Sequence, residues 1–337
     1  MRPRGQRGPP PGAPPLTIRS LLFDSDREER IVELEAKVVR SLGRDRLLWV
    51  DIVDPTPEEL EEVGGALDVP DELRPIGQGT RPDLQRHQGW IRLPVLAVQA
   101  PTDEPAAKQV LKRVGVEVLA GENVVVTIHE GAVDAIDDTT EHLRDEPGLG
   151  VLDAAALLAA LVDRILALYL RHAEMIERRI DDLDELAIRG SQAGAYLGEV
   201  VALRRRVAGL RRSLAPHREV FGPLARPDFE IAALGRPWPG LVDRLEATLR
   251  SVENVRDLLV GSVALQQSST AQRVNDVMKR LTLLNAILLP SVVLAGVMGM
   301  NFKLGFFDTA DNFWWVLGAM AALAVGTLLV AQKRGWL

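Results

Sequence analysis

Two long stretches without a charged residue limit what this chain can fold into more than any other feature. Residues 281–302 and 312–332 contain no Asp, Glu, Lys or Arg. Each is long enough to cross about 30 Å of hydrocarbon as a helix, for which roughly 20 residues suffice. Two buried helices of a soluble protein are the alternative, but a buried helix seldom runs so far without a charge. We therefore predict two membrane-spanning helices.

The flanking charges predict how this pair of spans is oriented. Only residues 303–311 separate the spans, so the two helices must form an antiparallel hairpin. Basic residues lie at the open end of the hairpin, namely Lys279, Arg280, Lys333 and Arg334. Because positive charge is retained on the cytoplasmic side, both chain termini are predicted to be cytoplasmic, in a multi-pass protein of the cell membrane. Residues 302–311 are then an external loop, and residues 333–337 a basic cytoplasmic tail.

The composition argues against several classes of protein. A formal net charge of −7 argues against nucleic acid as a partner. The chain contains no cysteine, which removes disulfides, thiolate metal sites and cysteine nucleophiles together. We find neither a phosphate-binding glycine loop nor a nucleophile–base arrangement, so an enzyme is not expected. Residues 1–16 are rich in Pro, Gly and Arg, which is typical of a disordered tail.

Residues 17–150 have the pattern of a mixed α/β domain in the cytoplasm. Segments rich in β-branched residues and bounded by Gly or Pro predict strands at 47–53, 90–99, 114–120 and 123–129. The short connection between the last two predicts a hairpin turn. Between the first two strands, Thr56, Pro57 and Glu59 have the spacing of a capping box, which predicts the start of a helix.

The remainder of the cytoplasmic part is predicted to be helical. Residues 151–240 favour cytoplasmic helices, the second of them running from Tyr196 to Phe221. From Leu241 onward, apolar residues recur at spacings of three and four, namely Leu245, Leu249, Val252, Val255, Leu259 and Val263. No proline interrupts this pattern before Pro290. We therefore predict one helix over residues 241–301, roughly 90 Å long, that serves as a stalk and continues into the first span.

The first span carries a motif that resembles a known family. The segment "NDVMKRLTLLNAILLPSVVLAGVMGMNF", residues 275–302, is similar to the pore helix of the CorA family of divalent-cation channels, within the CorA/Mrs2/ZntB superfamily. Gly299, Met300 and Asn301 match the Gly-Met-Asn motif of that family. The resemblance implies an α+β cytoplasmic domain with long helices, two C-terminal transmembrane helices in the lipid bilayer, and assembly into a homopentameric funnel. It also implies a selectivity filter made by this tripeptide, in which a ring of Asn301 holds hydrated Mg²⁺.

One face of the first span is the predicted lining of the pore. The residues at spacings of three and four along this face are Asn275, Met278, Leu281, Thr282, Asn285, Leu289, Val292 and Gly296. An unpaired amide is costly in hydrocarbon, so this face is expected to meet water and not lipid. A hydrogen bond between packed helices is the alternative for Asn285. Met278, Leu281 and Leu289 are candidates either for a hydrophobic constriction or for ordinary packing, and Gly299 is expected to allow a tight exit from the helix.

Acidic clusters are the candidates for regulation by cytoplasmic Mg²⁺, which the family senses between subunits. The carboxylates in question are Asp134, Asp137, Asp138, Asp181, Asp182 and Asp184, together with Glu185. Solvated helix faces are the alternative explanation for both clusters. His129 and Glu130 lack the spacing of an HExxH motif, so a zinc hydrolase is not expected.

Three functional hypotheses follow from the sequence. The first is a channel for Mg²⁺, and also for Co²⁺ or Ni²⁺, driven by the membrane potential. The second is a Zn²⁺ transporter like the ZntB branch, although Met300 favours the magnesium branch. Lys303, two residues after Asn301, leaves the choice of ion open, because a lysine there would repel cations. The third is a non-conducting, membrane-anchored scaffold or sensor, for which Asn301 would be dispensable.

Overall fold

The structure is a computed structural model of the whole chain. The residues that it describes are 18–23, 29–34, 42, 46–73, 84–99, 111–145, 153–189, 193–224, 238–300 and 310–333. The predicted tail at residues 1–16, most of the predicted external loop and residues 334–337 lie outside them.

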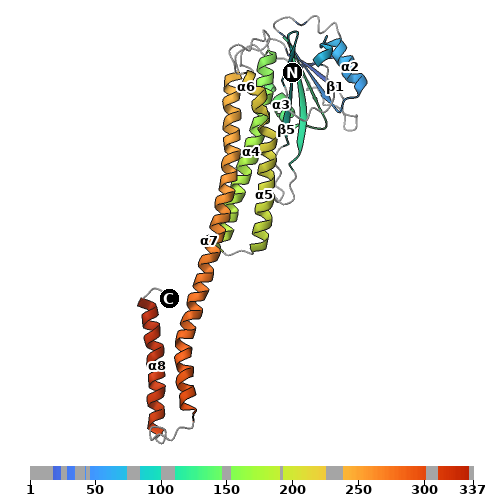
Figure 1. Cartoon of the computed structure of the whole chain (residues 1–337). Coiled ribbons are helices and arrows are strands. Elements are labelled where there is room, and N and C mark those ends of the chain that lie inside the picture. The colour runs from blue at the N-terminus through green and yellow to red at the C-terminus, as the bar shows by residue number, and fades with distance from the viewer. Residues whose placement is uncertain are drawn as a thin grey trace, which may run out of the picture. The chain divides into compact units, whose positions relative to one another are not determined.

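A seven-stranded sheet forms the α/β part of the chain (Figure 1). Its strands are β1 (Ile18–Phe23), β2 (Glu29–Ile31), β3 (Leu47–Val53), β4 (Gln85–His87), β5 (Trp90–Val98), β6 (Arg113–Ala120) and β7 (Val124–His129). Their order in the sheet is β2-β1-β3-β7-β6-β5-β4, with β3 and β7 parallel and all other neighbours antiparallel. The four predicted strands are confirmed, and the β6–β7 hairpin is closed by Gly121 N–H donating to the Val124 carbonyl at 2.9 Å.

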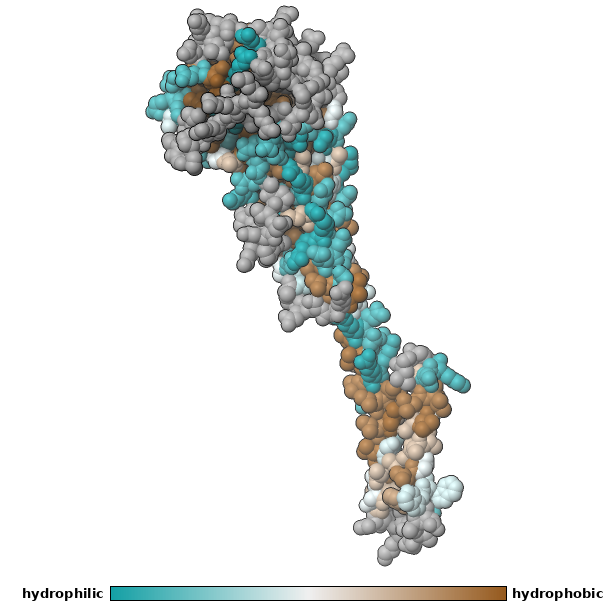
Figure 2. All heavy atoms as spheres, turned by 180° about the vertical axis from the view of Figure 1, so that it is seen from behind, coloured by the Kyte–Doolittle hydropathy of each residue, from teal (hydrophilic) through white to brown (hydrophobic). Residues whose placement is uncertain are grey.

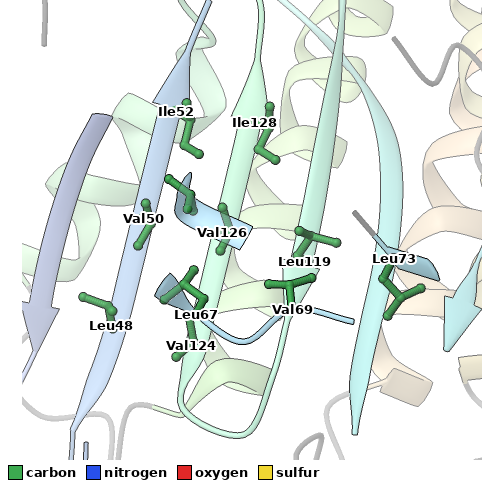
Figure 3. Close-up of a cluster of buried hydrophobic side chains, with 11 residues drawn as sticks. Leu48, Val50, Ile52, Leu67, Val69, Leu73, Leu119, Val124, Val126 and Ile128 are labelled. Atoms are coloured by element: carbon green, nitrogen blue, oxygen red, sulfur yellow. The ribbon is translucent and has the colours of Figure 1, made fainter. Parts of the chain in front are cut away.

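One face of the sheet is covered by helix α2 (Pro57–Ala66) and the short 3-10 helix η1 (Asp71–Leu73). The predicted capping box is confirmed: Glu59 N–H donates to Thr56 Oγ1 at 3.2 Å, and Thr56 N–H donates to Glu59 Oε2 at 2.8 Å. A cluster of buried aliphatic side chains fills the space between sheet and helices (Figure 3), comprising Leu48, Val50, Ile52, Val63, Leu67, Val69, Leu73, Leu119, Val124, Val126 and Ile128. This apolar layer fixes which residues of β3 and β7 point the other way.

Helices of very different length, from 8 to 36 residues, follow the sheet along the chain. They are α3 (Asp134–Asp145), α4 (Ala154–Arg189), α5 (Ala193–Leu214) and α6 (His217–Leu224). Tyr169 of α4 donates its hydroxyl hydrogen to the Leu96 carbonyl of β5 at 2.9 Å. The sequence predicted one helix as far as Phe221, and this prediction is wrong. The chain turns at Ala215 and Pro216, because proline has no N–H to continue the helical hydrogen bonds, and α6 begins at the next residue.

Helix α7 (Trp238–Met298) is a single helix of 61 residues. Its apolar stripe is buried from Leu241 through Leu259, with each member at most 7% exposed. The expected next member, Val263, is only half-buried, and Ser262 takes the buried position at 2% exposure. The helix also begins earlier and ends earlier than residues 241–301. The second long apolar helix, α8 (Ala310–Lys333), includes the predicted span at 312–332.

The chain divides into two compact units. One comprises residues 1–183 and 192–261 and contains the sheet, and the other comprises residues 184–191 and 262–337 and contains the apolar part of α7 with α8. These divisions fall within α4 and α7, not at residues 150 and 240, where the sequence suggested domain boundaries. The domain boundaries that the sequence suggested stay a prediction.

Candidate functional site

The apolar ends of α7 and α8 form a helical hairpin. Both helices have the length and composition needed to cross a membrane. Figure 1 shows α8 running alongside the last part of α7, and Figure 2 shows hydrophobic side chains gathered over this hairpin. Most of these side chains are exposed in the single chain: Leu289 and Val292 are each 67% exposed, and Trp315 is 76% exposed. A surface of this kind requires lipid or further copies of the chain to cover it.

Partly buried residues mark where the two helices face each other. On α7 they are Leu283, Ile287, Pro290, Ser291, Leu294 and Met298. On α8 they are Asn312, Val316, Met320, Ala324, Thr327 and Ala331. Apart from the adjacent Pro290 and Ser291, both sets recur at spacings of three and four, as expected of one stripe on each helix. The hairpin is therefore held together along a narrow seam.

The predicted pore positions lie on the other side of α7. At about 100° per residue, Asn285, Leu289 and Val292 point roughly opposite to the seam with α8. All eight predicted positions, from Asn275 to Gly296, are exposed in the single chain. The structure thus leaves this face without a partner within the described part of the chain. Nothing in a single chain tests whether it lines a pore, which stays a prediction.

The polar groups on this face differ in what they offer. Thr282 Oγ1 donates to the Met278 carbonyl of its own helix at 2.8 Å, so its hydroxyl hydrogen is occupied. The side-chain carboxamides of Asn275 and Asn285 have no hydrogen-bond partner among the described residues. Asn285 lies inside the predicted span, where an unpaired carboxamide would be costly against lipid, whereas Asn275 lies six residues before that span. Their chemistry suits contact with water or with the hydration shell of an ion.

Two backbone hydrogen bonds close the end of α7. Gly299 N–H donates to the Ala295 carbonyl at 3.0 Å, and Met300 N–H donates to the Val297 carbonyl at 3.2 Å. Gly299 has no positive φ, and an added Cβ would lie 3.5 Å from the nearest carbonyl oxygens, an ordinary contact. The backbone of Gly299 therefore lies outside the left-handed region, and the expectation that Gly299 allows a tight exit from the helix stays a prediction. Asn301, the predicted filter residue, lies outside the described residues.

The acidic candidates are distributed among separate contacts. Asp138 in α3 pairs with Arg171 of α4 at 2.8 Å. Asp182 pairs with Arg179 at 3.2 Å within α4, and Asp184 accepts a hydrogen bond from Ser262 of α7. The remaining candidates are Asp134 and Asp137 in the first turn of α3, and Asp181 and Glu185 on exposed positions of α4. In one chain, the described residues contain no group of three His, Asp or Glu side chains that could hold a metal ion.

The carboxyl group of Asp137 lies in an unusual electrostatic setting. Burial raises its pKa, and the nearby Asp51 carboxylate adds to this effect, while Arg19 on β1 acts in the opposite direction. A carboxyl group with a raised pKa holds a proton more readily than an ordinary aspartate.

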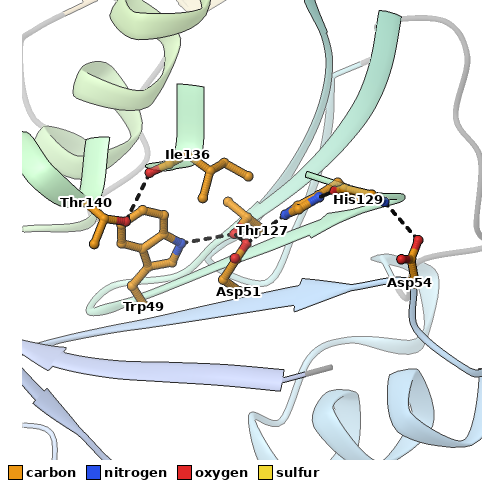
Figure 4. Close-up of polar contacts among 8 residues, drawn as sticks. Trp49, Asp51, Asp54, Thr127, His129, Ile136 and Thr140 are labelled. Carbon is orange, nitrogen blue, oxygen red and sulfur yellow. Dashed lines mark hydrogen bonds and ion pairs between the residues drawn. The ribbon is translucent and has the colours of Figure 1, made fainter. Parts of the chain in front are cut away.

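A buried polar cluster at β3 and β7 was missed by the sequence analysis (Figure 4). Trp49 Nε1 donates to Thr127 Oγ1 at 3.0 Å, Thr127 Oγ1 donates to Asp51, and His129 Nε2 lies 3.1 Å from Asp51 Oδ1. All four side chains are at most 6% exposed. The alternation of Trp49 and Asp51 with the apolar residues of β3 was the available signal. Only the parallel pairing of β3 with β7 brings Thr127 and His129 next to Trp49 and Asp51.

The geometry of this cluster assigns a charge to His129. Its Nδ1 lies 2.6 Å from the Gly131 carbonyl, and its Nε2 faces the Asp51 carboxylate, so both nitrogens meet acceptors. Burial acts to lower the pKa of His129, but the hydrogen bond and charge of Asp51 outweigh it, and the pKa is raised. Asp54 accepts from Gly131 N–H at 2.8 Å, which ties the end of β3 to the turn after β7. The cluster locks two strand ends together and leaves no imidazole nitrogen free for a metal.

The fold and the hairpin define a class of membrane protein. In this class a mixed α/β domain continues through a very long helix into two C-terminal apolar helices. The family model described as "CorA-like Mg2+ transporter protein" matches residues 44–333. The chain therefore belongs to this family of divalent-cation transporters, and the family resemblance suggested by the sequence is confirmed.

Individual relatives span different metals. The "Putative metal ion transporter YfjQ" of Bacillus subtilis is 26% identical over 266 residues, covering 76% of this chain and 78% of the relative. The "Cobalt/magnesium transport protein CorA" of Thermotoga maritima is 28% identical over 230 residues, covering 66% and 64%. The "Zinc transport protein ZntB" of Cronobacter sakazakii is 23% identical over 304 residues, covering 88% of each chain.

The fold of a solved relative agrees with that of the whole chain. The complete structure of the CorA magnesium transporter from Methanocaldococcus jannaschii aligns with a TM-score of 0.70 at 19% identity. The alignment covers 96% of this chain and 100% of that one. The predicted fold class, an α/β domain with long helices and two C-terminal apolar helices, is thereby confirmed.

Proposed function

We propose that the chain is one subunit of a homopentameric channel that conducts Mg²⁺, and also Co²⁺ or Ni²⁺, into the cytoplasm. The observation that carries this proposal is the face of α7 opposite the seam with α8. That face combines the unpartnered carboxamide of Asn285 with the small residue Gly296 and bulky apolar groups such as Leu289 and Val292. Two helices cannot enclose a water-filled path, so several copies of α7 must contribute this face to one pore.

The membrane potential supplies the driving force in this proposal. A divalent ion crossing 100 mV gains about 4.6 kcal/mol, twice the value for a single charge. The positive-inside pattern of the flanking basic residues places both termini in the cytoplasm and the 302–311 loop outside. Cations would then meet the Gly299-Met300-Asn301 turn first and move toward the α/β domain.

A ring of Asn301 side chains is the proposed filter. Mg²⁺ gives up its water reluctantly, so a filter that accepts hydrogen bonds from coordinated water can select the ion while it is hydrated. Neutral carboxamides also bind less tightly than carboxylates would, which conduction requires. We propose that cytoplasmic Mg²⁺ closes the pore by binding at acidic residues between neighbouring subunits, with the α4 cluster around Asp184 as the candidate.

Ion uptake into liposomes that contain the purified full-length protein tests this function. Under an inside-negative potential, the wild type is expected to take up Mg²⁺ at a rate that rises with voltage. Asn301→Ala and Asn285→Leu are each expected to reduce uptake at least about tenfold, because a lost polar contact with a hydrated ion costs on the order of 1.4 kcal/mol. Gln332→Ala removes an exposed carboxamide at the end of α8 and serves as the matched control.

The alternatives predict different results in the same assay. Preferred uptake of Zn²⁺ that depends on a pH gradient would place the chain with the zinc transport relatives. Absence of flux for every divalent ion, from a correctly assembled oligomer, would instead support a membrane-anchored scaffold or sensor. Wild-type rates in Asn301→Ala would contradict the proposed filter.

A further inference from the structure

Directly before the membrane span, α7 presents a polar stripe toward the last turns of α4. Ser262, Gln266, Ser269 and Arg273 follow one another at spacings of four, three and four residues, so they share one face of the helix. This stripe continues the buried apolar stripe that ends at Leu259. N-terminal to this point, α7 packs through leucine and valine side chains. C-terminal to it, Ser262, Ser269 and Arg273 make hydrogen bonds to α4, whereas the buried Gln266 Oε1 has no hydrogen-bond partner among the described residues.

The hydrogen bonds converge on the C-terminal end of α4. Arg273 Nη2 donates to the Ala187 carbonyl at 2.9 Å and to the Ile188 carbonyl at 2.8 Å. Ser269 Oγ donates to the same Ala187 carbonyl at 3.3 Å, and Ser262 Oγ donates to the Asp184 carboxylate. All of these residues belong to one compact unit of the structure.

The chemistry of a helix end explains why an arginine suits this position. The last four carbonyls of a helix have no partner within the helix, and they carry the negative end of the helix dipole. Because α4 ends at Arg189, the Ala187 and Ile188 carbonyls belong to this group. A guanidinium group supplies both hydrogen-bond donors and the complementary charge. An arginine from another helix therefore fastens the end of α4 in place.

We propose that Arg273 is a positioning residue that couples the cytoplasmic helix α4 to the pore-lining part of α7. This proposal rests on the proposed channel function. Arg273 lies two residues before Asn275, the first predicted pore position, so a displacement of α4 reaches α7 at the cytoplasmic mouth of the pore. Asp184, a candidate regulatory carboxylate, belongs to the same set of contacts between α4 and α7, because it accepts a hydrogen bond from Ser262. An ion bound near Asp184 would act on the pore through these hydrogen bonds.

Three variants of the full-length protein test this role. Arg273→Gln removes the charge, whereas Arg273→Lys keeps the charge but replaces the planar guanidinium group by an ammonium group on a shorter side chain. Arg256→Gln is the matched control, because Arg256 is an exposed arginine of α7 that pairs with no residue in the described part of the chain. Each variant is reconstituted, and Mg²⁺ uptake is measured without and with millimolar Mg²⁺ on the cytoplasmic side. Amide hydrogen exchange is measured in the last turn of α4 in parallel.

Loss of the hydrogen bonds from Arg273 to the end of α4 has two expected consequences. In Arg273→Gln, exchange in the last turn of α4 should rise roughly tenfold, since hydrogen bonds to a charged donor are lost. The ratio of uptake without and with cytoplasmic Mg²⁺ should fall toward one, while uptake without Mg²⁺ is retained. Arg273→Lys should be intermediate, and Arg256→Gln should behave as the wild type.

The results that overturn the proposal are distinct from failure of the channel function. If amide hydrogen exchange in the last turn of α4 is as slow in Arg273→Gln as in the wild type, the hydrogen bonds of Arg273 do not hold that turn in place. Faster exchange with an unchanged response to cytoplasmic Mg²⁺ would reduce Arg273 to an ordinary helix cap. If the wild type itself conducts no ion, the channel function fails, and the coupling of α4 to a pore falls with it, whatever the exchange measurement shows.

Discussion

Acidification should destabilise the α/β domain through one buried histidine. His217 is 1% exposed and lies where α6 meets the end of β5. Its Nδ1–H donates to the Leu214 carbonyl at 3.1 Å, and its Nε2 accepts from Leu96 N–H, also at 3.1 Å. A proton on Nε2 would set one N–H directly against another. Burial lowers the pKa of His217 from 6.5 to about 4, in agreement with this geometry.

The direction of the effect follows from proton binding in the two states. Between about pH 4 and pH 6.5 the unfolded chain binds a proton at this histidine and the folded chain does not. Stability is therefore complete above pH 6.5 and falls as the pH decreases. The full pKa difference corresponds to about 3.4 kcal/mol, of which about 2 kcal/mol is lost by pH 5. For a unit of this size that loss lowers the melting temperature by about 4–8 °C.

Thermal unfolding of the detergent-solubilised protein, followed by circular dichroism at pH 7.5 and pH 5, measures this loss. Other groups titrate over the same range, so the informative quantity is the difference between the wild type and His217→Gln. Glutamine retains a donor and an acceptor but does not titrate, so its loss between the two pH values should be smaller by about 2 kcal/mol. His87→Gln on β4 is the control. An identical pH dependence in the wild type and His217→Gln would refute the reasoning.

Two further predictions concern the stability of the same domain. Thr56→Ala removes the N-cap of α2 and should cost about 1 kcal/mol, seen as a lower melting temperature, whereas Thr56→Ser should retain most of the stability. Thr127→Val leaves Trp49 Nε1 without its acceptor and removes a donor from buried Asp51, which should cost about 2–3 kcal/mol. Thr140→Val is the matched control, because this buried hydroxyl bonds only to a carbonyl of its own helix, and an equal loss would contradict the role of the cluster.

Local patterns in the sequence were sufficient for strands β3, β5, β6 and β7 and for the start of α2, whereas β1, β2 and β4 were not predicted. The capping box at Thr56, the β-branched strands and the turn between β6 and β7 depend on neighbouring residues, and all were predicted and confirmed. The two spans followed from length and the absence of charge alone. The failures had local causes as well: Pro216 ends a helix that the apolar pattern continues, and Ser262 replaces Val263 because the stripe shifts by one residue.

Contacts between distant segments could not be derived in this way. Asp51 and His129 meet only because β3 and β7 are parallel neighbours, and the sequence does not specify which strands pair. Arg273 finds the end of α4 across 85 residues of chain. Both contacts depend on long-range packing, for which periodicity carries no information.

The sequence by itself determined that this chain has an α/β domain, a long helix and two membrane-length segments, because hydrophobic length and period are local properties. Only the tertiary structure decided which side of α7 faces α8 and which side is left for other partners. The seam between the two helices takes up the stripe from Leu283 to Met298. That choice leaves Asn285, Leu289 and Val292 on the opposite side, because residues half a turn apart on a helix cannot face the same neighbour.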